Sequence, residues 1–178
     1  MRRSSLFLLS AAAAVAALVG MALPANAATA DTAVTLTLTG EAVNITAPTS
    51  ATLVGTIGTT PVSGQLGQVT VIDNRGTAAP SWVANVSTTN FNAPAGSGLP
   101  PIPVANIHYN PGTVTRVNNT GTATAVDFTL ELTPVQTVTA TGGPGTNSAS
   151  WNPTLTVDIP AAAVAGNYTA TVTHSTVP

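Results

Sequence analysis

Hydrophobic and polar residues alternate with a period of two along much of the chain, which is the pattern of β-strands. The clearest runs are residues 34–39, 126–133, 155–159 and 168–175, in which aliphatic or aromatic side chains alternate with threonine or acidic side chains. A strand of this kind has one apolar and one solvated face, as in antiparallel sheets. Shorter strands are predicted at 43–46, 52–57, 66–72, 81–87, 102–109, 113–117 and 135–140.

Turn sequences rich in glycine, proline and asparagine separate these runs, at 73–76, 94–98, 110–112 and 142–145. Short strands spaced by such turns predict an all-β fold, an antiparallel β-sandwich of the Ig-like or Greek-key-like kind. The one helical candidate is 161–165, where we expect a single turn at most. No linker divides the chain, so we predict one domain over residues 28–178.

The first 27 residues have the pattern of a signal peptide. Arg2 and Arg3 precede an apolar run from Leu6 to Leu23, and the small residues that end at Ala27 resemble a cleavage site. We therefore expect cleavage after Ala27 and a secreted protein, extracellular or associated with the cell wall. An uncleaved signal anchor is the alternative.

The charge content narrows the choice of partners. Charged residues make up only 6% of the chain, against about 25% in ordinary soluble domains. Beyond the leader the only lysine or arginine residues are Arg75 and Arg116, so the clustered cations needed for nucleic-acid binding are missing. We also expect no membrane association once the leader is removed. Without cysteine, the chain has neither disulfides nor thiolate metal sites.

The residues that catalysis requires are scarce. His108 and His174 are the only histidines, and no G-x-S-x-G nucleophile motif occurs. His174 continues the apolar face of the last strand, which indicates packing rather than base catalysis. Asp73 and Asn74 lie in a turn and lack the spaced acids of a calcium loop. We therefore predict no enzyme activity, no cofactor and no metal site.

Aromatic residues are what a glycan-binding surface would use. Trp82 and Trp151 are the candidates, the first at the start of a strand and the second beside a glycine-rich loop. For Trp82 a core position is the competing interpretation. Tyr168 follows Gly166 at the start of the last strand, where sandwich domains often place a tyrosine whose hydroxyl bonds to the preceding loop. A simple core position is its alternative.

Two segments together resemble the WxL domain, a cell-surface module of Gram-positive bacteria. The first is Val69-Thr70-Val71-Ile72-Asp73-Asn74-Arg75-Gly76, followed by Ser81-Trp82-Val83-Ala84 and a phenylalanine at 91. The second is Ile159-Pro160, followed by Gly166-Asn167-Tyr168 and Val172-Thr173-His174. Ala84 and Val172 stand in place of the motif leucines, and His174 in place of the second motif tryptophan. The chain thus resembles a divergent member, of a type suited to a high-GC (actinobacterial) organism.

The resemblance implies non-covalent attachment to the cell wall through peptidoglycan, with Trp82, Tyr168 and His174 at the positions of interest. We expect a secreted, non-catalytic cell-surface protein of this kind. The alternative is a structural or adhesive subunit that binds other surface proteins by pairing β-strands. A small secreted hydrolase or inhibitor is a third interpretation, which would need a histidine near a serine and an acid in a pocket.

Overall fold

The computed structural model describes residues 29–59, 61–122 and 128–178. Contacts divide the chain into two units, Met1–Leu36 and Thr37–Pro178. The second unit contains strands β1 (Val43–Thr46), β2 (Val62–Gln65), β3 (Val69–Asp73), β4 (Ser81–Thr88), β5 (Ile107–Asn110), β6 (Thr115–Val117), β7 (Phe128–Thr129), β8 (Val135–Thr141), β9 (Asn147–Trp151), β10 (Thr154–Val157) and β11 (Val172–Val177), with a 3₁₀ turn, η1 (Val104–Asn106). The strands pair antiparallel throughout. The predicted all-β antiparallel sandwich is confirmed.

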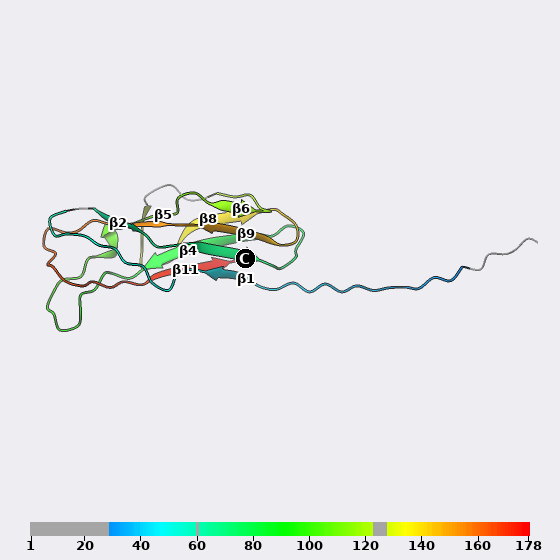
Figure 1. Ribbon diagram of the computed structural model, residues 1–178, viewed down its shortest axis with the longest axis horizontal. Coiled ribbons are helices and arrows are strands. Elements are labelled where there is room, and N and C mark those ends of the chain that lie inside the picture. Colours follow the sequence, from blue (N-terminus) through cyan, green and yellow to red (C-terminus); the bar gives the residue numbers. More distant parts are fainter. Residues whose placement is uncertain (1–28, 60, 123–127) are drawn as a thin grey trace, which may run out of the picture. The chain divides into compact units, whose positions relative to one another are not determined.

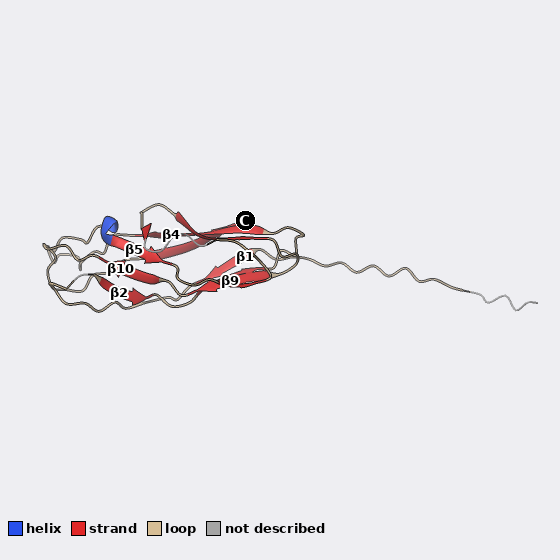
Figure 2. Ribbon diagram, turned by 90° about the horizontal axis from the view of Figure 1, so that it is seen from above, coloured by secondary structure: helices blue, strands red, loops and turns tan. Residues whose placement is uncertain are grey.

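The strands form three sheets, in the orders β1-β3-β9-β6, β2-β10-β5-β7 and β11-β4-β8 (Figure 1). The same stretches of chain pass through the first two sheets, one after the other. β2 leads into β3, β5 into β6 and β9 into β10 after gaps of a few residues. They therefore form one interrupted layer, and β11-β4-β8 forms the other. Figure 2 shows β2, β5 and β10 at one end of the sandwich and β1 and β9 at the other.

Glycine and proline account for the interruption between the first two sheets. Gly67 separates β2 from β3 with φ +93°, a conformation that disfavours side chains, and its amide donates to the Asn152 side chain at 3.1 Å. Pro153 follows Asn152 between β9 and β10, where a ladder donor is missing. Turn chemistry thus splits long alternating segments into two short strands each.

The core consists of inward-facing residues of both layers. One cluster is Val69, Val71, Trp82, Ala84, Val138, Ala140, Ala149 and Trp151. The other is Val86, Ile102, Ile107, Tyr109, Leu130, Leu155 and Val157. Full burial of one such aliphatic side chain stabilises the fold by about 1.5–3 kcal/mol. Most of these residues occupy the inward positions of the alternating strands.

The prediction of a strand at 34–39 is wrong. Val34, Leu36 and Leu38 are 86%, 79% and 84% exposed, and the backbone at these residues forms no strand. A strand needs a neighbour for its backbone groups, and within the described part of the chain no backbone hydrogen bond is formed by residues 33–39. The alternation is present, but a pairing partner is not.

Three further predictions are corrected. Residues 52–57 have no strand hydrogen bonds, although they run beside β2. Of the run at 126–133, residues 126 and 127 lie outside the described residues and only Phe128–Thr129 is strand, because the chain then leaves β5 to cross to the other layer. The strand predicted at 102–109 is interrupted by η1, and only its last part belongs to β5. At 161–165 the expectation of a single turn at most is confirmed, with the Ala163 amide donating to the Pro160 carbonyl at 2.9 Å.

The predicted signal peptide, residues 1–27, lies outside the described residues. Among the residues that are described, no helix is long and apolar enough to cross a membrane.

Candidate functional site

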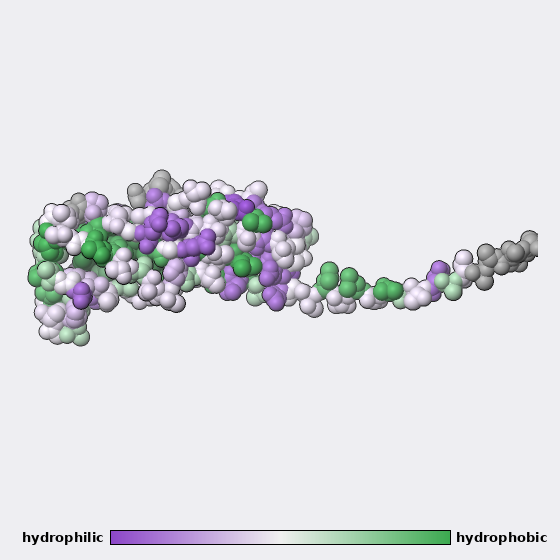
Figure 3. Space-filling model, in the orientation of Figure 1, coloured by the Kyte–Doolittle hydropathy of each residue, from purple (hydrophilic) through white to green (hydrophobic). Residues whose placement is uncertain are grey.

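An apolar groove of about 860 Å³ opens between the two layers of the unit Thr37–Pro178. One wall is formed by residues 51–57, the other by residues 163–170, and the floor includes Phe91, Ile102, Val157 and Ile159. A smaller hollow of about 200 Å³ continues it between residues 47–51 and 170–174. The two share Ala51, Leu53, Phe91 and Ala170, so we treat them as one feature, the edge groove. Figure 3 shows apolar (green) residues gathered at the end of the sandwich that carries β2.

The first wall is a segment that lies along β2 without joining its sheet. A Cβ on Gly55 would lie 2.3 Å from the Val62 side chain, and one on Gly64 would lie 3.3 Å from the Leu53 side chain. The glycines therefore let the two segments approach closely. Among the described residues, the backbone of 47–55 nevertheless forms no hydrogen bond. Its amide and carbonyl groups remain open to a partner.

The second wall is the free edge of the other layer. Thr169 and Asn92 exchange two backbone hydrogen bonds of 2.9 and 2.8 Å, which extends the pairing of β11 with β4. Successive residues of an antiparallel strand direct their backbone groups to opposite sides. The backbone groups of Tyr168 and Ala170 therefore point away from β4, along the groove. An unpaired edge of this kind is a template for another strand.

Tyr168 is the one sequence-predicted site residue on a wall of the main groove. Its hydroxyl donates a 3.0 Å hydrogen bond to the carbonyl oxygen of Val164, so the predicted bond from a corner tyrosine to the preceding loop is present. The bond holds the 163–168 turn in place. Val164, in the same wall, is 47% exposed.

Trp82 and Trp151 lie in the core, 1% and 2% exposed. The indole of Trp82 donates to the Asn147 side chain at 3.0 Å, and that of Trp151 to the Tyr109 hydroxyl at 2.9 Å. The structure thus corrects their proposed role as sugar platforms, because alternation turns both side chains inward. For Trp82 the core interpretation is the one that holds.

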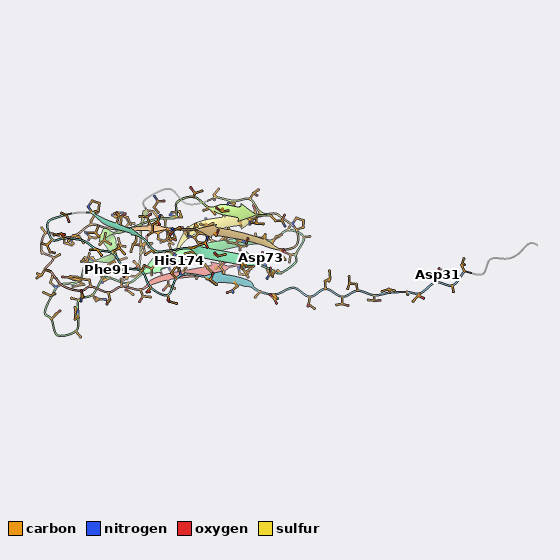
Figure 4. All side chains as sticks on the ribbon, viewed as in Figure 1. Asp31, Asp73, Phe91 and His174 are labelled. Atoms are coloured by element: carbon orange, nitrogen blue, oxygen red, sulfur yellow. The ribbon has the colours of Figure 1, made fainter. Side chains whose placement is uncertain are left out.

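His174 sits at the inner end of the smaller hollow, half-buried. Its Nε2 lies 3.0 Å from the Tyr109 hydroxyl, and burial lowers the pKa of His174 to about 4. Because the Tyr109 oxygen already accepts from Trp151, its proton is free to go to the neutral imidazole. His174 therefore has a structural role as a neutral side chain packed against Tyr109. Figure 4 shows its position, with Phe91 on one side and Asp73 on the other.

Asp73 was predicted to lie in a turn, but it ends strand β3, where its side chain has a structural role. The carboxylate is fully buried and accepts from the Arg75 side chain at 2.8 and 2.9 Å and from the Asn147 amide at 3.1 Å. These bonds, chiefly that from Arg75, lower the pKa of Asp73 to about 2. The carboxylate oxygens that calcium would need are already in use.

The chemistry of the edge groove is apolar. Its main part is lined by aliphatic, aromatic, threonine and asparagine residues and by no charged side chain. Across residues 29–59, 61–122 and 128–178, no three His, Cys, Asp or Glu side chains gather in a way that could hold a metal ion. Such a groove can bury the apolar face of a partner and pair with its backbone.

Sequence reasoning missed this groove. Its walls are more than a hundred residues apart in the chain, and the residues that line it have the pattern of ordinary sandwich positions. Phe91 was singled out only as part of the family resemblance. The local signal that could have pointed here is Gly55 and Gly64, which mark close packing of two segments.

Comparisons with protein-family models, curated proteins and solved structures find no match to this chain. The resemblance to the WxL domain therefore stays a prediction.

Proposed function

We propose that this protein is a secreted, non-catalytic cell-surface protein that binds partner proteins by β-strand addition at the edge groove. The observation that carries the proposal is the free edge at Tyr168 and Ala170 beside an uncharged apolar floor. The backbone of an added strand forms hydrogen bonds with such an edge, and every second side chain of that strand packs on the apolar floor.

The dimensions of the groove suit a short strand. After the turn at 163–168, the edge runs over residues 168–174 along both parts of the groove, and an extended segment rises about 3.3 Å per residue. A partner segment of about seven residues with apolar side chains at every second position matches this length. Because no charged side chain lines the main groove, a charge on the inward face of the partner would be buried without a counter-ion.

Attachment to peptidoglycan, which the WxL resemblance implies, is the competing proposal. Sugar rings stack on flat aromatic faces, but Trp82 and Trp151 are both buried. Phe91 and Tyr168 are the aromatic residues in the groove, and Tyr168 uses its hydroxyl within its own loop. These contacts favour a protein partner over a glycan.

Site-specific crosslinking on intact cells tests the proposal. A photoreactive residue replaces Val164 in the groove wall, and a matched control carries it at Val117 on β6, which is 59% exposed and outside the groove. We expect crosslinks from position 164 to an uncharged, alternating segment of a surface protein, identified by mass spectrometry, and none of these from position 117. Equal crosslinking from both positions, or none from 164, would contradict the proposal.

Co-sedimentation with purified peptidoglycan separates the two proposals. The exported protein and its Val164→Arg variant are compared, with folding checked by circular dichroism. Strand addition predicts no specific pelleting. Pelleting that the variant loses would instead assign the groove to the cell wall.

A further inference from the structure

We infer that the strand received by the edge groove is residues 33–39 of a second copy of this chain. The inference rests on the proposed function and names its partner. Each copy then carries both halves of one contact, the donated segment and the groove.

The segment has the composition of a strand that lacks a neighbour. It reads Ala-Val-Thr-Leu-Thr-Leu-Thr and contains no charged residue. Val34, Leu36 and Leu38 are each at least 79% exposed, and within the described chain the backbone of 33–39 forms no hydrogen bond. Solitary exposed aliphatic residues are common, but three in strict alternation with β-branched threonine form one apolar strand face.

The segment and the groove are complementary. In an extended chain the side chains of Val34, Leu36 and Leu38 lie on one face about 6.6 Å apart, and the three span about 13 Å. The edge at 168–174, which runs along both parts of the groove, accommodates this length. Their face would meet Phe91, Ile102 and other apolar floor residues. The threonines would face water, and the backbone would pair with the free edge at Tyr168 and Ala170. The flanking charges, Asp31 and Glu41, fall outside the inserted segment.

Chain geometry directs the segment to a second copy. The Glu41 amide donates to the Asn74 carbonyl at 3.0 Å, before β1 begins. β1 then runs away from this point, and the groove begins at Ala47, about 20 Å further along an extended chain. Leu38, three residues before Glu41, reaches about 11 Å at most. A copy therefore cannot bring its own Leu38 into its own groove, so the groove can receive the whole segment only from another copy.

Each copy would donate one segment and receive another. Two copies can therefore close into a pair by exchanging segments, or association can continue head to tail into chains or rings. In every case the contact joins a segment to a groove, whereas an ordinary symmetric dimer buries one patch of each copy against the same patch of the other.

Light scattering coupled to size-exclusion chromatography tests the inference on protein exported by the host. We expect the molar mass of the wild type to rise with concentration to multiples of the monomer. The double variant L36D/L38D should stay monomeric, because it places two charges in the uncharged groove. The matched variant T35D/T37D, altered on the opposite face, should assemble as the wild type does.

Mixing two variants, one with a blocked groove and one with a blocked segment, tests the contact more directly. Val164→Arg blocks the groove, leaves the segment intact and should be monomeric alone. With L36D/L38D, which keeps an intact groove, it should form one-to-one pairs and nothing larger. Leu36, Leu38 and Val164 are exposed, so circular dichroism should show folded protein in each case.

The inference is overturned if the wild type is monomeric throughout and a synthetic peptide of residues 31–41 does not bind the L36D/L38D variant. It is also overturned if L36D/L38D and T35D/T37D assemble alike. If the crosslinks from position 164 then lead to an alternating segment of another surface protein, the proposed function stands without this inference. If position 164 crosslinks to nothing, both fail.

Discussion

The Tyr109 hydroxyl lies 3.0 Å from Nε2 of His174 and also accepts a 2.9 Å hydrogen bond from the indole of Trp151. Tyr109 belongs to β5, Trp151 to β9 and His174 to β11, so one buried oxygen connects all three sheets. The rings of Tyr109 and His174 are also in tilted contact, 5.7 Å between centroids. Burial raises the pKa of Tyr109, which keeps the phenol protonated as the donor to His174.

Replacing Tyr109 with phenylalanine should destabilise the protein by about 1–3 kcal/mol, because a buried indole N–H and an imidazole nitrogen lose their partner. The free energy of unfolding from urea titration measures this. Tyr168→Phe is the matched control, since it removes one bond to an exposed loop and should cost about 0.5–1.5 kcal/mol. Equal losses would argue against a special role for the Tyr109 oxygen.

The half-buried His174 should make stability depend on pH. Its pKa is about 4 in the folded state against the ordinary 6.5, so the unfolded chain takes up the proton first as pH falls. Its contribution is complete above about pH 6.5 and is lost as pH falls toward 4. We expect about 2 kcal/mol less stability at pH 4.5 than at pH 7.5 from this residue. His174→Gln should flatten that part of the profile, and an unchanged profile would contradict the assignment.

Asp73→Asn should cost about 2–4 kcal/mol at pH 7, because Arg75 and Asn147 lose a buried carboxylate. In the wild type the pKa of Asp73 is about 2 against 3.8, so its contribution is present above about pH 4 and is lost as pH falls through 2. Asp158→Asn is the control, since that side chain is 52% exposed beside His108 and should cost less than about 1 kcal/mol. Denaturation at pH 7 of both variants makes the comparison, and similar losses would contradict it.

Gly67→Ala should destabilise the protein more than Gly58→Ala. Both glycines have positive φ, +93° and +86°, so both variants carry about 1 kcal/mol of backbone strain. At Gly67 the new Cβ would also lie 2.6 Å from Cγ of Pro48, whereas at Gly58 nothing lies within 4 Å. We expect a total of about 2–4 kcal/mol for Gly67→Ala. Thermal midpoints of the two variants check this, and equal midpoints would show that Pro48 moves away from the new Cβ without a measurable loss of stability.

The sequence predicted the features that depend on neighbouring residues. The strands at 43–46 and 81–87 correspond to β1 and β4, because alternation and turn residues are local signals. The bond of Tyr168 to its own loop spans four residues and was predictable for the same reason. Asp73 was predicted to open a turn, but it is the last residue of β3 and pairs with Val43 and Asn147 on the neighbouring strands. Its side-chain bond to Asn147 joins residues far apart in the chain and has no local signal.

By itself the sequence determined the all-β class, the inward faces of the strands that form and the scarcity of charged residues, because each of these follows from composition or from a period of two. Only the tertiary structure decided which strands find partners. Residues 34–39 have the same alternation as the paired strands but no partner among the described residues, and residues 51–57 and 163–170 meet across a groove that neither segment encodes. Pairing depends on which edges come together in the folded chain, and that is a property of the whole sandwich.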